Sequence, residues 1–316
     1  MIPPVALLIF NRPKVTAHVF AAVAAARPSQ LFIAADGPRP DHPDDIALVA
    51  ATRDVVAQVD WPCEVHRDYA ETNLGLRVRV PGALDWVFRT VEEAIILEDD
   101  CVPHPSFFAF CEELLAYYRH DTRIAQICGI NFAPVDHAIR YSYDFSRRPH
   151  CWGWASWRRA WRHYDVDVPI WNELRDDNRL IDLLGNDAKV RENLRNAHDL
   201  YQAANWDHQW AFACGVQNMV SIVPCVNLVS NIGFGAGATH TIRASRIANF
   251  PTSAMPLPLV HRPYVLPNSA HERIMDTMLA PSLVAQIAAR IVPRRIKRRL
   301  VVEYKRYAAR KIPQRG

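Results

Sequence analysis

The chain has 316 residues, of which 50% are hydrophobic and 22% are charged; this composition excludes an intrinsically disordered chain, a collagen and a coiled coil. The formal net charge is +4, but it is unevenly spread. Residues 286–316 hold eleven Lys or Arg and one acid, so this segment carries +10 and the rest of the chain carries −6. A strongly basic segment on a mildly acidic body is typical of proteins that bind an anionic surface.

The sequence shows no run of about 18 apolar residues, so no membrane-spanning helix is expected. The first apolar stretch, Val5–Phe10, has no positive residues before it, which predicts a core strand and not a signal peptide. The seven Cys include no Cys-x-x-Cys pair, and this favours reduced thiols over a disulfide framework or a zinc ribbon. These features together predict a cytoplasmic protein.

Over residues 1–130, short apolar runs alternate with longer amphipathic segments. This alternation predicts an α/β fold with a Rossmann-like, mostly parallel sheet sandwiched by helices. The expected strands are Val5–Phe10, Leu31–Ala35, Cys63–His66, Ala94–Leu97 and Ile124–Cys128, and the expected helices are Pro13–Ala26, Asp45–Val59, Arg77–Thr90 and Pro105–Arg119.

Beyond residue 130 the regular alternation ends. We expect residues 1–130 and residues 131–241 to form two halves of the same domain, of which the second is an acceptor-binding half. A Pro-rich irregular segment over 242–281 and a basic, amphipathic helical tail over 282–316 would follow. The expected helices of the second half are Ser156–His163, Arg179–Tyr201 and Asp207–Val216, and its expected strands are Val220–Val223 and Val226–Ser230.

Polar clusters follow four of the predicted strands, either directly or within a few residues. In open α/β sheets, ligands bind outside the carboxyl ends of the strands, so these clusters mark the expected site. They are Asn11-Arg12, Asp36-Gly37, Asn73–Gly75 and Glu98–Asp100.

The acidic triplet Glu98–Asp100 ends an apolar strand. Three adjacent carboxylates repel one another, and a hard divalent ion such as Mg²⁺ or Mn²⁺ takes carboxylate oxygens as ligands. The alternative is a solvated strand end whose acids cap the next helix. The position at the carboxyl end of a central strand favours the metal-binding interpretation.

A second acidic position, Asp207, lies between Trp206 and Trp210. A carboxylate in this partly desolvated setting would have a raised pKa and suits a general base. It could equally be the N-cap of the following helix, and the two interpretations are compatible. Because Trp faces stack on sugar rings, both Trp are candidates for an acceptor or sugar platform, together with Trp154.

Two further patterns leave alternatives open. Trp154, Trp157 and Trp161 follow helical i, i+3, i+7 spacing, which fits a core stripe or an aromatic floor under a sugar. The Gly-rich stretch of residues 227–241 could approach a phosphate through its backbone, and His240 is a tentative metal ligand.

Taken in series, these motifs resemble the nucleotide-sugar glycosyltransferases of the GT-A fold. The chain is more closely similar to bacterial polysaccharide-cluster proteins of the family-2-like type, some of which carry the label "haemolytic protein". It is distantly similar to the inverting N-acetylglucosaminyltransferases that extend the N-glycan core. The resemblance covers about residues 2–241 and rests on Phe10–Pro13, Ala35–Arg39, Asn73–Gly75, Ile95–Asp100 with Pro103 and Phe107-Phe108, Gly153-Trp154, Trp206-Asp207 and Asn231–Thr241.

The resemblance implies that residues 1–130 are a nucleotide-sugar-binding half, and it implies a role for each matched residue. Asp100 would hold the metal, Mn²⁺ or Mg²⁺, and Asp207 would be the general base for the acceptor hydroxyl. Asp36 would accept a hydrogen bond from the base of the nucleotide, which is expected to be UDP. The remaining donor-site residues are Asn11, Arg12, Asn73, Gly75, Glu98 and Asp99.

The expected function is therefore metal-dependent transfer of a hexosyl or N-acetylhexosaminyl group in bacterial surface polysaccharide or glycan assembly, with inversion. A glycan or a lipid-linked acceptor would receive the sugar. Residues 290–315 would place the enzyme on an anionic membrane surface at the inner face of the plasma membrane, and no nucleic-acid partner is expected. The alternatives are a non-catalytic membrane-surface binding protein that retains the fold, or another carboxylate or metal enzyme such as a nucleotidyltransferase or a glycosidase.

Overall fold

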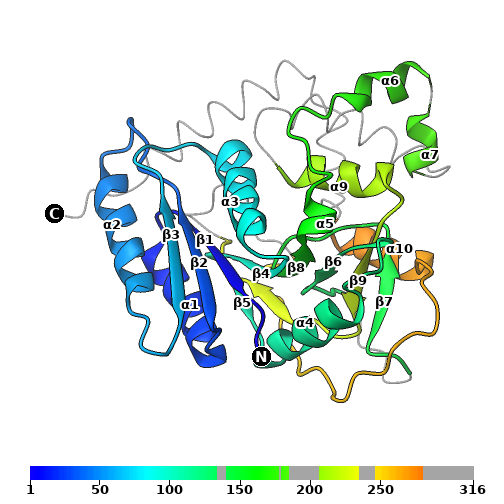
Figure 1. Cartoon of the computed structure of the whole chain (residues 1–316), viewed down its shortest axis with the longest axis horizontal. Helices are drawn as coiled ribbons and strands as arrows, with labels where there is room; N and C mark the ends of the chain where they lie inside the picture. Colours follow the sequence, from blue (N-terminus) through cyan, green and yellow to red (C-terminus); the bar gives the residue numbers. More distant parts are fainter. Residues whose placement is uncertain (134–139, 178, 185–205, 235–245, 280–316) are drawn as a thin grey trace. The chain divides into compact units, whose positions relative to one another are not determined.

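The computed structural model describes residues 1–133, 140–177, 179–184, 206–234 and 246–279 (Figure 1). The chain divides into a compact unit, Met1–Met275, and a second unit, Asp276–Gly316. Of the second unit only residues 276–279 are described. Among the described helices, none has the length and apolar character that a membrane crossing requires.

The first half of the main unit is a parallel β–α–β arrangement. Strand β1 (Val5–Ile9) lies between β2 (Gln30–Ala35) and β4 (Glu93–Glu98), and β3 (Glu64–Tyr69) pairs with β2 at the edge of the sheet. All these pairings are parallel, and every residue of β1 is buried, as expected for a strand covered on both faces. The connecting helices are α1 (Pro13–Ala26), α2 (Asp44–Ala57) and α3 (Leu76–Thr90).

The second half of the sheet is mixed. Strand β8 (Trp154–Trp157) is antiparallel to both of its neighbours, β4 and β6 (Ile124–Cys128). Next to β6 lies the parallel strand β9 (Val220–Pro224), followed by the antiparallel strand β7 (Tyr143–Ser146). Within the described residues, the resulting eight-stranded sheet has the order β3-β2-β1-β4-β8-β6-β9-β7. A separate ribbon pairs β5 (Cys101–Pro103) with β10 (Val229–Asn231).

Helices cover both faces of the sheet. Ala94 and Ile96 of β4 face a core cluster that includes α3 residues such as Leu84, while α4 (Pro105–Tyr117) contacts β4, β6 and β8 from the other side (Figure 1). Helix α9 (Asp207–Val216) joins the cluster on the α3 side through Trp210. This architecture confirms the predicted α/β fold, a mostly parallel sheet between helices.

The helix predicted over Ser156–His163 is confirmed only in its middle part. Trp154–Trp157 form the buried strand β8, and only Arg158–Trp161 are helical, as the short α5. The i, i+3, i+7 spacing of Trp is therefore not a helical stripe. Side chains alternate across a strand, so Trp154 joins the cluster on the α3 side, whereas Trp157 donates its Nε1–H to the carbonyl oxygen of Leu115 in α4 at 3.2 Å.

Other differences concern short or non-local elements. The sequence pattern predicts neither β5 nor β7, because both are short and depend on pairing with distant strands. The segment predicted to be irregular over 242–281 ends in helix α10 (Ser269–Leu279). The helix predicted over Arg179–Tyr201 is described only in its first part, where α7 (Leu180–Leu184) follows α6 (Ile170–Asp176); the remainder, like the predicted tail helices, lies outside the described residues.

Candidate active site

The strand order places a topological switch point between β1 and β4. From β1 the chain moves outward to β2 and β3, and it then returns to the other side of β1 as β4. Ligands of open α/β sheets bind in the crevice outside the strand ends at such a point. Arg12 follows β1 there, and Asp99 and Asp100 follow β4, so the structure brings together the polar clusters predicted from the sequence.

Arg12 is the cation that joins the two strand ends. Its guanidinium pairs with the carboxylate of Asp99 through Nε and Nη2, and Nη2 also lies 3.0 Å from Oδ2 of Asp100. Both acidic residues are buried. Burial alone would lower the pKa of Arg12, but the charges of Asp99 and Asp100 raise it above its usual value. The arginine therefore stays charged and partly neutralises the acids.

Arg12 does not neutralise all the acidic groups at this end of the sheet. Burial raises the pKa of Glu98 well above its usual range, and the negative charges of Asp100 and Asp99 add to this effect. The carboxylate of Asp207, at the start of α9, raises the pKa of Glu98 further, so it lies close enough to act on this group. Burial also raises the pKa of Asp99 to about 6, against the opposing effect of Arg12. Four carboxylates (Glu98, Asp99, Asp100 and Asp207) and one guanidinium thus form what we name the carboxylate cluster.

Residues around Asp100 complete this end of the crevice. Asn231, at the end of β10, donates from Nδ2 to Oδ1 of Asp100 at 3.3 Å. Gly233 passes so close that a Cβ on it would lie 2.0 Å from Oδ2 of Asp100. Burial raises the pKa of the Cys151 thiol, and Asp207 and Glu98 raise it too, so Cys151 borders the cluster. The sequence shows no signal for Cys151, whereas Asn231 and Gly233 lie in the Gly-rich stretch.

The donor set fits a hard divalent cation that is completed by a ligand. Carboxylate oxygens are the donors that Mg²⁺ and Mn²⁺ prefer, and the cluster carries more negative than positive charge. Within the described residues, no three His, Cys, Asp or Glu side chains are grouped so that they could hold a metal by themselves. Protein sites for Mg²⁺ commonly supply one or two carboxylates and leave the remaining positions to water and substrate phosphates. The tentative ligand His240 lies outside the described residues.

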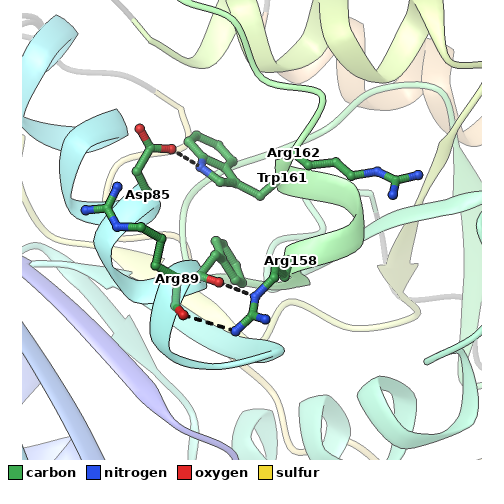
Figure 2. A pocket seen from close by; sticks show the side chains of 6 residues that line it. Asp85, Arg89, Arg158, Trp161 and Arg162 are labelled. Atoms are coloured by element: carbon green, nitrogen blue, oxygen red, sulfur yellow. Dashed lines mark hydrogen bonds between the residues drawn. The ribbon is translucent and has the colours of Figure 1, made fainter.

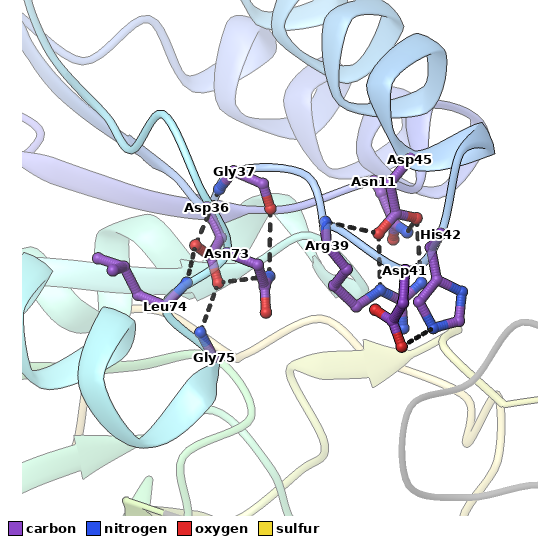
Figure 3. A network of polar contacts seen from close by, with 10 residues as sticks. All are labelled: Asn11, Asp36, Gly37, Arg39, Asp41, His42, Asp45, Asn73, Leu74 and Gly75. Carbon is purple, nitrogen blue, oxygen red and sulfur yellow. Dashed lines mark hydrogen bonds and ion pairs between the residues drawn. The ribbon is translucent and has the colours of Figure 1, made fainter.

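Asp36, at the end of β2, organises the other end of the crevice (Figure 3). Its Oδ1 accepts from the backbone N–H groups of Gly37 and Leu74, both at 2.8 Å. Its Oδ2 accepts from Nδ2 of Asn73 at 2.9 Å and from the N–H of Gly75 at 3.0 Å. The carboxylate therefore fixes the turn of residues 73–75 at the start of α3. Gly75 suits this turn because its φ of 75° lies in the left-handed region.

A second buried carboxylate, Asp45 of α2, holds the loops that follow β1 and β2 (Figure 3). Asn11 donates from Nδ2 to Oδ1 of Asp45 at 2.7 Å. Arg39 forms a two-point ion pair with the same carboxylate, at 2.6 and 3.0 Å. These contacts, chiefly the hydrogen bonds from Arg39, lower the pKa of Asp45 to about 2. The predicted donor-site residue Asn11 is thus tied to a carboxylate that sequence reasoning missed.

The three predicted platform residues lie in the core. Trp154 and Trp210 have no exposed surface and Trp206 is 4% exposed. Trp154 stacks on Trp206 with ring centroids 6.0 Å apart, and Nε1 of Trp210 donates to Oε1 of Gln126 at 2.6 Å. Buried rings offer no free face to a sugar, so the structure supports the core interpretation of these side chains.

A separate cavity of about 360 Å³ lies between α3 and α5. Asp85, Phe88, Arg89, Arg158 and Trp161 line it together with Arg162. Arg158 caps the end of α3 by donating to the carbonyl oxygens of Phe88 and Arg89, and Nε1 of Trp161 donates to Asp85 at 2.8 Å (Figure 2). The guanidinium groups of Arg89 and Arg162 point in different directions in Figure 2, so the cavity lacks converging polar groups.

No known protein family and no curated protein matches the chain. Solved structures share parts of its fold. S. aureus TarS (residues 1–349) is 9% identical, with 70% of this chain and 57% of that chain covered and a TM-score of 0.36. Mouse xyloside xylosyltransferase 1 in its apo form is 9% identical, with 68% and 83% covered and a TM-score of 0.36.

UDP-glucose pyrophosphorylase complexed with UDP-glucose is 10% identical, with 46% of this chain and 63% of that chain covered and a TM-score of 0.26. The chain therefore spans less than two thirds of TarS and of the pyrophosphorylase. At these identities and TM-scores, the likenesses support no conclusion about activity.

Proposed function

We propose that the protein is a glycosyltransferase that moves a sugar from a nucleotide-sugar to an acceptor hydroxyl. The observation that carries this proposal is the carboxylate cluster at the β1–β4 switch point. It combines a guanidinium, which binds phosphate well, with an excess of buried carboxylates that a divalent cation would neutralise. The sequence resemblance to GT-A glycosyltransferases supports the same function.

The donor would lie along the crevice. The diphosphate would sit near Arg12 and Asp100, and the nucleoside would extend toward the turn of residues 73–75. Asp100 would hold Mn²⁺ or Mg²⁺, which neutralises negative charge on the leaving diphosphate when bound, and Glu98 would bind the donor. Asp99 keeps Arg12 oriented through its two-point pairing. Fixed positions of donor and acceptor would supply much of the rate enhancement.

Asp207 would take the proton from the acceptor hydroxyl. It starts α9 and lies near Glu98, beside the expected position of the sugar. One base is enough for a single displacement with inversion, and Asp207 supplies it. Retention by double displacement needs a second carboxylate as nucleophile, and the other three carboxylates of the cluster are assigned here to the metal, the donor and Arg12. Inversion is therefore part of this proposal. The acceptor would be a glycan or a lipid-linked glycan of surface polysaccharide assembly.

The proposed location is the cytoplasm, at the inner face of the plasma membrane. Its support is the basic composition of residues 290–315, which lie outside the described residues. Each basic residue near an anionic leaflet contributes about 1 kcal/mol of attraction. A lipid-linked acceptor would be presented on that surface.

Thermal unfolding with UDP, GDP, CMP and dTDP, each with and without Mn²⁺, tests the donor site. A ligand at about 100 times its Kd adds about 2.7 kcal/mol to the free energy of unfolding, which corresponds to several degrees in a chain of this size. We expect a Mn²⁺-dependent rise with one nucleotide, lost in Asp100→Asn and kept in Asp54→Asn, an acid in α2 remote from the cluster. A folded protein that responds to no nucleotide would refute the proposal.

Transfer itself is tested with sugar derivatives of the nucleotide that binds. Asp207→Asn should still bind the nucleotide but lose at least about a hundredfold in transfer, since general-base catalysis contributes 10²–10⁴. Hydrolysis of a glycoside without nucleotide or metal would instead identify a glycosidase.

A further inference from the structure

The carboxylate of Asp36 has no acceptor capacity left for a ligand. A carboxylate has about four lone-pair sites, and those of Asp36 accept from Gly37, Asn73, Leu74 and Gly75 at 2.8–3.0 Å. The side chain is also buried, with 7% exposure. Another group must therefore make the hydrogen bond to the base that the resemblance assigns to Asp36.

Asn73, which contacts Asp36, carries a side-chain oxygen that can accept this hydrogen bond. Its Nδ2 donates to Oδ2 of Asp36 at 2.9 Å and to the carbonyl oxygen of Gly37 at 3.1 Å. Two acceptors on one side of the amide fix its orientation, because a flipped amide would place oxygen against oxygen. The side-chain oxygen of Asn73 points away from both partners in Figure 3. Among the described residues, no donor to this oxygen is recorded.

The place of Asn73 in the sheet fits the nucleoside end of the proposed donor. Asn73 follows β3 and is held against the end of β2, whereas Asp99 and Asp100 follow β4. The sheet order puts β1 between β2 and β4, so the two ends of the crevice are two strand spacings, about 10 Å, apart. A nucleoside diphosphate whose phosphates lie at Arg12 would extend over this distance.

We infer that Oδ1 of Asn73 selects a nucleobase whose ring nitrogen carries a hydrogen, as in uracil, thymine or guanine, and that Asp36 is the positioning residue that aims it. This inference rests on the proposed function and names the class of nucleotide that the site takes. The ring N–H donates to Oδ1. Cytosine presents a bare ring nitrogen at the equivalent position, and two acceptors then face each other.

Calorimetric titration of the wild-type protein with UDP and with N3-methyl-UDP, in the presence of Mn²⁺, tests the donor requirement on the ligand side. The methyl group removes the ring N–H and adds bulk at the same atom, so CDP, whose ring nitrogen has no hydrogen and no added bulk, is titrated alongside it. We expect N3-methyl-UDP to bind at least about tenfold more weakly, since the site then leaves a polar group unpaired. CDP should show the same loss. Equal affinities for UDP and N3-methyl-UDP would overturn the inference.

The protein-side test compares Asn73→Ala with Glu71→Ala, an exposed neighbour in the same loop. In Asn73→Ala, the affinity for UDP should exceed the affinity for N3-methyl-UDP by less than about threefold. Glu71→Ala should keep the affinity ratio of the wild type. A folded Asn73→Ala protein that keeps the full ratio would overturn the assignment. Absence of binding by any nucleoside diphosphate would refute the proposed function as well, whereas binding without base preference would refute only this inference.

Discussion

The two ends of the crevice differ in how their charges are satisfied. At the turn of residues 73–75, Asp36 accepts four hydrogen bonds and the turn is complete without a ligand. In the carboxylate cluster, Arg12 faces several acids and the pKa of Glu98 is strongly raised. The turn of residues 73–75 is therefore preorganised. In the carboxylate cluster, repulsion between the acids raises the free energy of the folded protein, and a bound cation would lower it. This contrast teaches that one sheet edge can combine a region fixed by hydrogen bonds with a region of unbalanced charge.

The largest expected effect comes from a substitution at Gly37 that disrupts the turn of residues 73–75. A Cβ on Gly37 would lie 2.5–2.6 Å from backbone atoms of Thr72, so Gly37→Ala must displace the chain just before the turn. We expect a loss of about 3 kcal/mol in the free energy of unfolding, measured by urea denaturation. Gly82→Ala in α3 is the matched control, because no atom lies within 4 Å of its Cβ position. That variant should be slightly more stable than the wild type.

The next effect concerns Asp45, whose ion pair with Arg39 supports the neighbouring loops. Its pKa is lowered to about 2 in the folded protein, from about 3.8. In the folded protein Asp45 therefore stays ionised to a lower pH than in the unfolded chain. The resulting stabilisation, about 2 kcal/mol, is fully present above pH 4 and is lost as the pH falls toward 2. Asp45→Asn should lose this amount at pH 7 and differ less from the wild type at pH 2.5. The same measurement on Asp44→Asn, an exposed neighbour, should show no such pH-dependent difference.

The smallest expected effect comes from removing one ionisable group, Glu98, from the carboxylate cluster. The pKa of Glu98 is raised in the folded state, so ionising it opposes folding as the pH rises above about 4.3, its unfolded value. Glu98→Gln should therefore stabilise the ligand-free protein at pH 8 and leave its stability unchanged at pH 4, as measured by urea denaturation at the two pH values. The same variant should weaken the Mn²⁺-dependent nucleotide response. A wild-type protein that is more stable than Glu98→Gln at pH 8 would contradict the electrostatic account.

The elements that were predicted accurately are those with strong local signals. Helix α1 has its predicted bounds, Pro13–Ala26, because Pro at its first position and a periodic apolar face define it locally. Strand β6 matches its predicted range, Ile124–Cys128, as a short run that is apolar except for Gln126. Strand β8 was missed because its Trp spacing mimics a helix, and only pairing with β4 and β6 makes Trp154–Trp157 a strand.

In the candidate site, too, local patterns were predictable from the sequence, whereas contacts between distant residues were not. The sequence indicates that Arg12, Asp36, Asn73 and the acidic triplet follow strands, and parallel strands bring such residues to one edge of a sheet. It does not indicate which donors saturate Asp36, nor that Asp45 holds Asn11. These partnerships join residues more than 30 positions apart, and no local pattern encodes them.

The sequence by itself determined the α/β alternation, the position of the polar clusters at the strand ends and the basic character of the C-terminal segment. These properties depend on the order of apolar and polar residues along short stretches of chain. Only the tertiary structure decided that β8 runs antiparallel, that Trp154 and Trp210 are buried, and that the side-chain oxygen of Asn73 points away from Asp36 and Gly37. Each of these depends on which distant groups pack and form hydrogen bonds together, and the folded chain alone brings those groups into contact.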